Sequence, residues 1–233
     1  MKATPVEERS RGRAWLALLF LVPVPSFGTL AGLHWWPGPL GQALYLASKI
    51  WLLAFPLFWL LKVERSHLGF RRPSRAGWLA GLAQGLLLII VMLAGFALFG
   101  SQLVDPATVQ AQASENRLNE PLIFLGFFLY ICLVNSLIEE IVWRGFVGQQ
   151  WLTLVGRAWA PPLSALCFTI HHTVALSLQM GWVATALGSL GVFVGGMLWS
   201  WLYQRYDSLW PGWVSHVGAD IAVAVMAWQL IMG

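Results

Sequence analysis

The stretch Pro121–Phe146, PLIFLGFFLYICLVNSLIEEIVWRGF, decides the fold that we predict for this chain. It begins as an apolar run long enough to enter a lipid bilayer. It ends in two adjacent carboxylates, Glu139 and Glu140, followed by Arg144. An ionisable group at the edge of a membrane span is costly, so it indicates a functional site with a partner nearby. We therefore expect polar residues from other spans to gather around the two glutamates.

The composition of the whole chain predicts an all-α, polytopic membrane protein. Of its 233 residues, 58% are hydrophobic and 10% are charged, with a mean hydropathy of +0.68. A soluble domain carries about 25% charged residues. Apolar runs of about 20 residues recur along the chain, and this is the length of a transmembrane helix. The net charge of +4 is small and lies mostly in two loops, so we expect contact with the lipid bilayer and not with nucleic acid.

Seven apolar runs are expected to cross the membrane as a transmembrane helical bundle. They cover about 14–34, 40–61, 77–99, 121–143, 160–179, 182–203 and 210–231. We expect Pro23 and Pro25 to kink the first run. We also expect the connection 145–158, which is only partly apolar, to lie along the interface. The count becomes six or eight if the first run or this connection behaves differently.

The distribution of Lys and Arg predicts the orientation of the chain. These residues lie in alternate loops: the N-terminal segment, 62–75, 144–157 and 203–208. By the positive-inside rule, such loops face the cytoplasm. Seven spans then place the N-terminus in the cytoplasm and the C-terminus outside. Since the chain is short and carries no organelle signal, we expect an integral protein of a prokaryotic plasma membrane.

The two glutamates are predicted to have different surroundings. On a helix, residues four apart share a face, and Glu before Arg is the favourable order, so Glu140 is expected to pair with Arg144. Glu139 points about 100° away from that pair. One carboxylate would be fixed by a cation while its neighbour could act as a base. The alternative is a structural ion pair near the cytoplasmic interface.

Two further stretches place polar residues inside apolar runs. In CFTIHHT, 167–173, His171 and His172 are adjacent, and His172 shares a helix face with Phe168. In SHVGAD, 215–220, His216 and Asp220 are four residues apart and face one direction. A buried histidine is a base, a metal ligand or a core residue whose hydrogen bonds are satisfied. The coincidence of three such sets at helical spacing favours function.

The order EExxxR, FxxxH, HxxxD in successive predicted helices resembles the CPBP family of intramembrane proteases. This family includes CAAX prenyl endopeptidases of the Rce1 type and the bacterial Abi proteins. The motifs here are 139–144, 168–172 and 216–220, and the resemblance covers a little under half of the chain. It implies a single membrane domain in which 1–120 hold the first three spans and 121–233 the catalytic core.

The resemblance also implies a role for each motif residue. Glu139 would be the general base that activates water, and His172 would assist it. His216 and Asp220 would stabilise the oxyanion of the tetrahedral intermediate. These roles suit peptide hydrolysis, which needs a base within reach of water and donors aimed at the developing negative oxygen.

Other positions of the family pattern concern the shape of the site. Glu140 and Arg144 would hold the site in shape. Family members often carry Asn where this chain has Asp220. An ionised Asp only accepts hydrogen bonds, so Asp220 would act as a protonated donor or would orient His216 by accepting its N–H.

Two competing mechanisms stay open at this stage. Glu139, His172 and His216 could bind Zn²⁺ as a two-histidine, one-carboxylate set, although we favour a mechanism without a metal or other cofactor. Cys132 lies on nearly the same helix face as Glu139, which raises a cysteine mechanism, and His171 is a further candidate residue. Most buried cysteines are inert.

The resemblance implies an endopeptidase that cleaves near the C-terminus, or after the leader, of a membrane-attached protein or peptide. By topology the glutamates lie toward the cytoplasmic side, from which we expect substrate to enter. A second hypothesis is a non-proteolytic membrane protein, either an immunity or scaffold factor or a proton-coupled transporter that relays protons through Glu, His and Asp. A transporter would be expected to show an internal repeat, and we see none.

Overall fold

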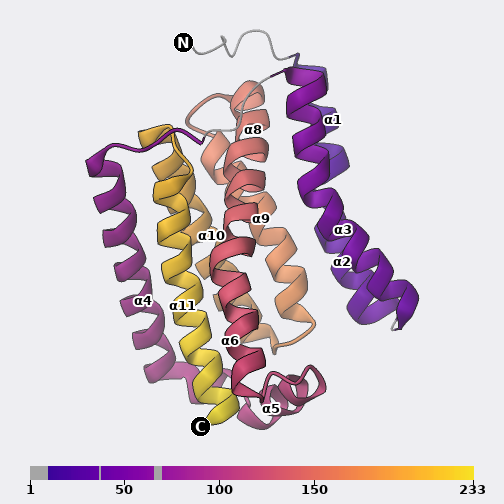
Figure 1. Cartoon of the computed structure of the whole chain (residues 1–233), viewed down its shortest axis with the longest axis vertical. Coiled ribbons are helices and arrows are strands. Elements are labelled where there is room, and N and C mark those ends of the chain that lie inside the picture. The colour runs from indigo at the N-terminus through magenta and orange to yellow at the C-terminus, as the bar shows by residue number, and fades with distance from the viewer. Residues whose placement is uncertain (1–9, 37, 66–69) are drawn as a thin grey trace. The chain divides into compact units, whose positions relative to one another are not determined.

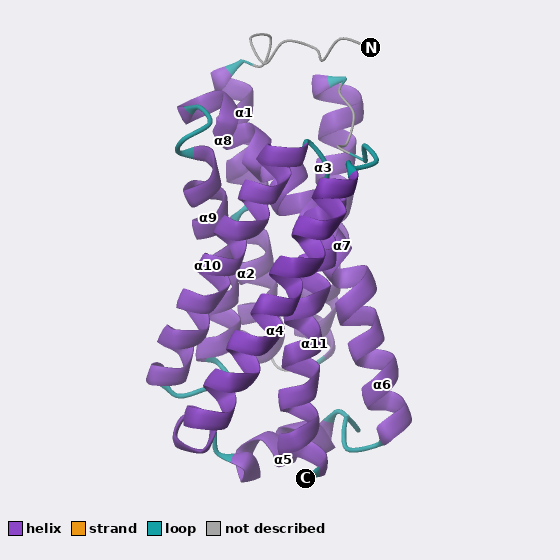
Figure 2. Cartoon of the chain, turned by 90° about the vertical axis from the view of Figure 1, so that its left-hand side faces the viewer, coloured by secondary structure: helices purple, strands orange, loops and turns teal. Residues whose placement is uncertain are grey.

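The computed structural model describes residues 10–36, 38–65 and 70–233, and every regular element in these ranges is a helix. Figure 2 shows these helices with their connecting loops. The α elements are α-helices, and the η elements are π-helical stretches, whose backbone hydrogen bonds span five residues. In chain order they are α1 (Arg11–Leu21), α2 (Pro23–Leu30), η2 (Ala31–Trp35), α3 (Pro39–Phe58), η3 (Trp59–Glu64), α4 (Arg75–Leu103), α5 (Pro106–Glu115), α6 (Pro121–Leu129), η4 (Tyr130–Asn135), α7 (Ser136–Glu139), η5 (Glu140–Val147), α8 (Gly148–Val155), α9 (Ala160–Ser177), α10 (Trp182–Tyr206) and α11 (Trp210–Met232).

Six helical segments of the described chain are long and apolar enough to cross a membrane, so the prediction of an all-α, polytopic membrane protein is confirmed. They are Arg11–Trp35, Pro39–Glu64, Arg75–Gly100, Pro121–Val155, Trp182–Tyr206 and Trp210–Met232. The count lies within the predicted range of six to eight. The predicted fifth span forms the 18-residue α9, which is not among the six. Its Ser, Thr and His residues lower its hydropathy.

The fourth membrane segment is longer than its apolar run suggests. Helical backbone continues from Pro121 through Val155, a stretch of 35 residues. The connection 145–158, expected along the interface, is therefore mostly helix and includes α8. Helix formation continues because 145–155 contains no proline, and Gly156, with a φ of 80°, ends it.

The helices pack into two compact units, each described by itself. Unit 1 takes in the described residues of 1–70 together with 140–201. In it, α2 packs against α3 and α9, and α8 packs against α1 and α9. Phe55 of α3 meets Phe146 of η5 edge-to-face, with ring centroids 6.1 Å apart. These contacts bury η5, and with it the second glutamate of the pair.

Unit 2 takes in residues 71–139 and 202–233 and is built on one helix pair. Figure 1 shows α4 and α11 side by side, and α5, α6, η4 and α7 also pack against α11. The two backbones touch at glycines, since a Cβ added at Gly218 would lie 2.8 Å from the Cα of Gly85. Small residues allow such close approach in membranes, where packing drives helix association. The predicted division of the chain at residue 120 follows the motifs and stays a prediction.

The link between α4 and α6 is the short helix α5, which Asp105 caps. Its carboxylate accepts hydrogen bonds from the Thr108 hydroxyl at 2.7 Å and from the backbone N–H of Ala107 at 3.2 Å. These bonds, that of Thr108 foremost, lower the pKa of Asp105 below its ordinary value of 3.8. An ionised cap satisfies N–H groups that have no partner within the helix.

Candidate active site

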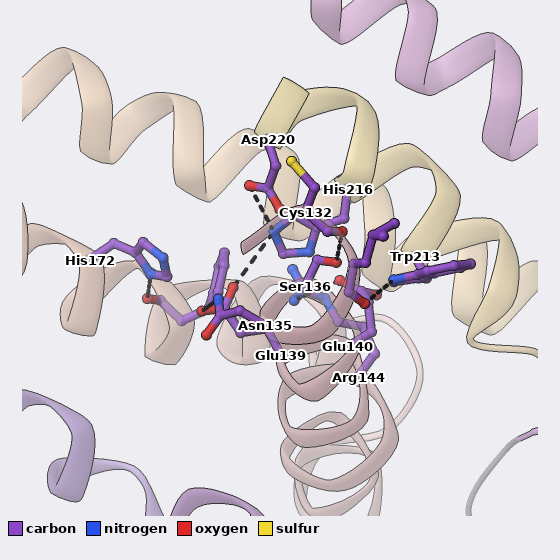
Figure 3. Close-up of polar contacts among 12 residues, drawn as sticks. Cys132, Asn135, Ser136, Glu139, Glu140, Arg144, His172, Trp213, His216 and Asp220 are labelled. Atoms are coloured by element: carbon purple, nitrogen blue, oxygen red, sulfur yellow. Dashed lines mark hydrogen bonds and ion pairs between the residues drawn. The ribbon is translucent and has the colours of Figure 1, made fainter. Parts of the chain in front are cut away.

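Glu139 lies at the end of α7, a single α-helical turn between the π-helical stretches η4 and η5. Its side chain is 8% exposed. One carboxylate oxygen, Oε1, accepts a hydrogen bond from Nδ2 of Asn135 at 2.9 Å. The other, Oε2, lies 3.6 Å from Nε2 of His216, as Figure 3 shows. Two of the four π-helical stretches of the described chain flank this glutamate, and π-helical turns are frequent at functional sites.

The partners of Glu139 in α11 come from one face of that helix. Trp213, His216 and Asp220 are spaced three and four residues apart. The Trp213 indole donates to the carbonyl oxygen of Leu133 in η4 at 3.3 Å. The Nε2 atom of His216 is 3.9 Å from Asp220 Oδ1, so the predicted shared face of these two residues is present (Figure 3). One helix face thus anchors η4 and presents an imidazole to Glu139.

The electrostatics of this cluster are those of two carboxylates around one imidazole. His216 is buried, and the Asp220 side chain is 16% exposed. Both carboxylates lie within 4 Å of the same nitrogen, yet beyond the usual hydrogen-bond length of about 3.2 Å. Charges this close interact strongly where water is scarce. The arrangement can pass a proton between a carboxylate and an imidazole, and it can hold a donor beside a base.

Cys132 belongs to the same unit. It is buried in η4, and its thiol lies on the Asp220 side of the cluster (Figure 3). Its carbonyl oxygen accepts the hydroxyl hydrogen bond of Ser136. A buried thiol usually behaves as a small apolar group, so its place beside Asp220 does not by itself indicate a nucleophile.

The predicted pair of Glu140 and Arg144 is present in unit 1. Nη1 of Arg144 lies 3.1 Å from Glu140 Oε1, and the two side chains are 1% and 0% exposed. The guanidinium carbon lies 4.6 Å from the ring centroid of Phe168 and 5.0 Å from that of Trp199. Arginine suits this position because its flat guanidinium stacks on aromatic rings while it binds a carboxylate.

Gly196 makes room for the guanidinium. A Cβ added there would lie 3.3 Å from Nη2 of Arg144 and 3.1 Å from the Cβ of Ala165. The small residue is thus part of the cage that holds Arg144.

His172 presents a defined ring orientation within α9. Its Nδ1 lies 3.0 Å from the carbonyl oxygen of Phe168, and the two rings are 4.2 Å apart between centroids. A carbonyl oxygen only accepts, so Nδ1 carries the proton and Nε2 of the neutral ring is an acceptor. The His171 ring is buried, with its centroid 5.0 Å from that of His172.

The predicted site residues therefore fall into two sets. Glu139, His216, Asp220 and Cys132 come together in unit 2, whereas Glu140, Arg144, His171 and His172 belong to unit 1. The boundary between the units runs between the two consecutive glutamates. Among residues 10–36, 38–65 and 70–233, no group of three or more His, Cys, Asp and Glu side chains is arranged to hold a metal ion. The metal-free and zinc alternatives both stay predictions.

Two residues of the cluster escaped the sequence-based prediction. Asn135 lies four residues before Glu139, and Trp213 lies three before His216. Both spacings place them on the helix face of the residue they support, and that was the available signal. A single amide and a single indole in an apolar run are otherwise unremarkable.

A comparison with known protein families gives a match in the region that contains these residues. Residues 121–222 match the model of a family described as type II CAAX prenyl endopeptidase Rce1-like. The match contains all three motifs and confirms the resemblance to the CPBP family. Neither the curated proteins nor the solved structures contain a match to this chain.

The match covers a little under half of the chain, and the six candidate membrane segments of the described residues place it within an integral membrane protein. Residues 121–222 are the Rce1-like region of this chain.

Proposed function

We propose that this protein is an intramembrane endopeptidase in which Glu139 activates the hydrolytic water. The observation that carries the proposal is the buried carboxylate of Glu139 beside the imidazole of His216, inside the region that matches a protease family. A glutamate with few water neighbours and a fixed donor beside it suits general base catalysis.

The proposed reaction transfers one proton twice. Glu139 takes a proton from water, and the water oxygen attacks the carbonyl carbon of the scissile peptide bond. Nε2–H of His216 donates to the oxyanion that forms, and Asp220, whose Oδ1 lies 3.9 Å from the same nitrogen, is proposed to orient the imidazole. The C–N bond then breaks, and Glu139 gives its proton to the leaving nitrogen. Atoms and charge balance, with a carboxylic acid and an amine as products.

His172 is proposed as a second group that binds the attacking water. This role follows the family pattern of motifs and not a measured distance. The acceptor Nε2 of its neutral ring is chemically suited to it. Glu140 and Arg144 are proposed to hold the second half of the motif in shape, because their buried pair is fixed by aromatic rings.

A zinc mechanism is the alternative for the same residues. Glu139, His172 and His216 would be the ligands, and the ion would supply a water of lowered pKa. The glutamate mechanism predicts that a strong zinc chelator leaves cleavage unchanged, whereas the zinc mechanism predicts its loss.

The substrate class follows from the resemblance to the protease family. We propose cleavage near the C-terminus or leader of a membrane-attached protein or peptide, with entry from the cytoplasmic half of the bilayer. The N-terminus is proposed to lie in the cytoplasm of a prokaryotic cell and the C-terminus outside.

The deciding experiment compares protein termini in whole cells by mass spectrometry. Cells carry the wild-type protein, Glu139→Gln or the control Glu115→Gln at equal expression. The control makes the same chemical change at an exposed position of α5. We expect specific precursors to accumulate, and their mature ends to vanish, in Glu139→Gln alone. Unchanged termini in that variant would overturn the protease proposal in favour of a non-proteolytic membrane protein.

A further inference from the structure

Asn135 is a polar side chain of the membrane segment to which the proposed reaction gives no role. It is the last residue of η4 and lies one α-helical turn before Glu139. Its Nδ2 donates to Glu139 Oε1 at 2.9 Å, a normal length for a hydrogen bond. A bond from an amide to an ionised carboxylate is stronger than one between neutral groups.

The bond makes the two oxygens of Glu139 different. Oε1 is held by Asn135, and Oε2 lies 3.6 Å from Nε2 of His216. The terminal torsion of a glutamate has a broad, roughly two-fold energy profile, so an unheld carboxylate exchanges its oxygens freely. A donor on one oxygen stops this rotation and keeps the other toward the imidazole.

The backbone that carries Asn135 is anchored to the helix that carries His216. Within η4, the carbonyl oxygen of Leu133 accepts the Trp213 indole hydrogen bond at 3.3 Å. Trp213 lies three residues before His216 on the same face of α11. The Asn135 donor, the Glu139 carboxylate and the His216 imidazole are therefore held by helical segments that pack against one another within unit 2.

The direction of the Asn135 bond differs from the usual bond of a polar side chain to its own helix. Several polar side chains in the helices bond backward to the carbonyl oxygen four residues earlier, as Ser136 does to Cys132 and Thr169 does to Ala165. This back-bonding is the ordinary solution for a polar side chain within a helix. Asn135 instead bonds forward to the Glu139 side chain.

We propose that Asn135 is a positioning residue that fixes Glu139 Oε1 and so presents Oε2 to His216 and the attacking water. This inference depends on the proposed function, since it assigns a role in the same reaction. If it holds, the rate of cleavage depends on the N–H donor of Asn135 and not only on the volume of its side chain.

The test removes the amide donor of Asn135 and measures both the rate of cleavage and the infrared bands of the Glu139 carboxyl group. Asn135→Leu has a similar size without an N–H, and Gln229→Leu makes a matched amide-to-Leu change on an exposed position of α11. In cells, we expect mature ends to form about 10- to 100-fold more slowly in Asn135→Leu, since small misplacement of a reacting group costs that much. Gln229→Leu should process at the wild-type rate.

Infrared spectra of the purified proteins provide a second measurement. The positions of the Glu139 carboxyl bands would not change if Asn135 had only a structural role. Subtracting the Glu139→Gln spectrum isolates the Glu139 carboxyl bands, and the same subtraction is made in the Asn135→Leu background. We expect the bands to shift when the amide donor is absent. Bands at unchanged positions would overturn the inference even if cleavage had slowed.

A second variant covers the case in which Asn135→Leu fails to fold. Asn135→Ala also removes the donor without adding a bulky side chain, so the same loss of cleavage is expected. Wild-type cleavage by either Asn135 variant overturns the inference and, if Glu139→Gln is inactive, leaves the proposed function standing. Wild-type cleavage by Glu139→Gln would instead overturn the proposed function.

Discussion

Two consecutive carboxylates in this chain have unlike neighbours. Glu139 meets a neutral amide and an imidazole, whereas Glu140 meets the guanidinium of Arg144. The carboxylate of Glu140 is thus engaged in a buried ion pair with an arginine. Pairs of titratable groups with contrasting surroundings are how sites divide catalytic and structural roles. At the scale of residues, these contrasting neighbours are the basis for proposing a catalytic role for Glu139 and a supporting role for Glu140.

Removing the guanidinium should destabilise the fold far more than removing the whole pair. Arg144→Met leaves Glu140 buried and uncompensated, which costs about 3–5 kcal/mol of unfolding free energy. In the double variant Glu140→Leu with Arg144→Met no charge is stranded, so we expect much of that loss to be recovered. Unfolding of the purified proteins in mild detergent, as a double-mutant cycle, measures the coupling.

An exposed pair provides the control for this cycle. Arg117 and Glu120 are 2.8 Å apart, with side chains 69% and 48% exposed. Arg117→Met should leave the unfolding free energy nearly unchanged, because surface ion pairs contribute little. Equal losses in Arg144→Met and in the double variant would contradict the role assigned to the buried pair.

At the scale of elements, the helix around the motif is not a uniform α-helix. A single α-helical turn, α7, lies between η4 and η5. The contacts at a spacing of four survive on both sides, at Asn135 with Glu139 and at Glu140 with Arg144. The motif spacing is therefore robust to the local change of pitch, and this explains why helical periodicity predicted the second pair correctly.

The close crossing of α4 and α11 yields a prediction about packing. Gly218→Ala adds a Cβ only 2.8 Å from the Cα of Gly85, so the two helices must separate. We expect the unfolding free energy to fall by about 1–3 kcal/mol, as for other overpacked sites. Thermal unfolding in detergent measures this loss. His216 lies two residues away on α11, so slower cleavage should accompany it.

Gly95→Ala is the control in the same helix. A Cβ at Gly95 meets no atom within 4 Å, and the change removes a flexible residue from α4. It should leave stability unchanged or slightly higher. If both alanine variants behaved alike, the glycine contact would not be what holds α11 on α4.

At the scale of the whole molecule, composition and charge were sufficient to predict a polytopic helical membrane protein. Six of the seven predicted apolar runs correspond to the described membrane segments, and the three motifs fall in α9, α11 and the segment Pro121–Val155. The helical extension through α8 was not predicted, because 145–158 mixes polar and apolar residues and contains Gly145 and Gly148, which lower its helix propensity. The π-helical turns could not be predicted from a pattern that assumes 3.6 residues per turn, whereas the spacing of Asn135 and Glu139 was a signal that the sequence offered.

The orientation of the chain can be tested by labelling introduced cysteines in intact cells. We expect an impermeant maleimide to label Ser114→Cys in α5, outside the cell, but not Arg72→Cys in the basic loop. Cys132 and Cys167 are buried, so the wild-type protein provides the unlabelled control. Permeabilised cells should label both variants, and the reverse pattern in intact cells would overturn the orientation.

A cysteine added after Gly233 extends this test to α9. It reacts from outside if α9 crosses the membrane, because four crossings then separate α5 from the C-terminus. It is protected if α9 does not cross, because only three crossings remain. Labelling of this residue therefore decides between seven and six spans.

The spacing of Glu140 and Arg144 also affects how the chain enters the bilayer during its synthesis. A single charged residue at the centre of a helix raises the free energy of insertion by about 2.5–3.5 kcal/mol. Here both charges lie on one continuous helix, one turn apart, so the two side chains can reach each other within that helix. The segment can therefore partition into lipid as a nearly neutral dipole before the ribosome has made Phe168 and Trp199. Membrane integration of this protein need not wait for its C-terminal half.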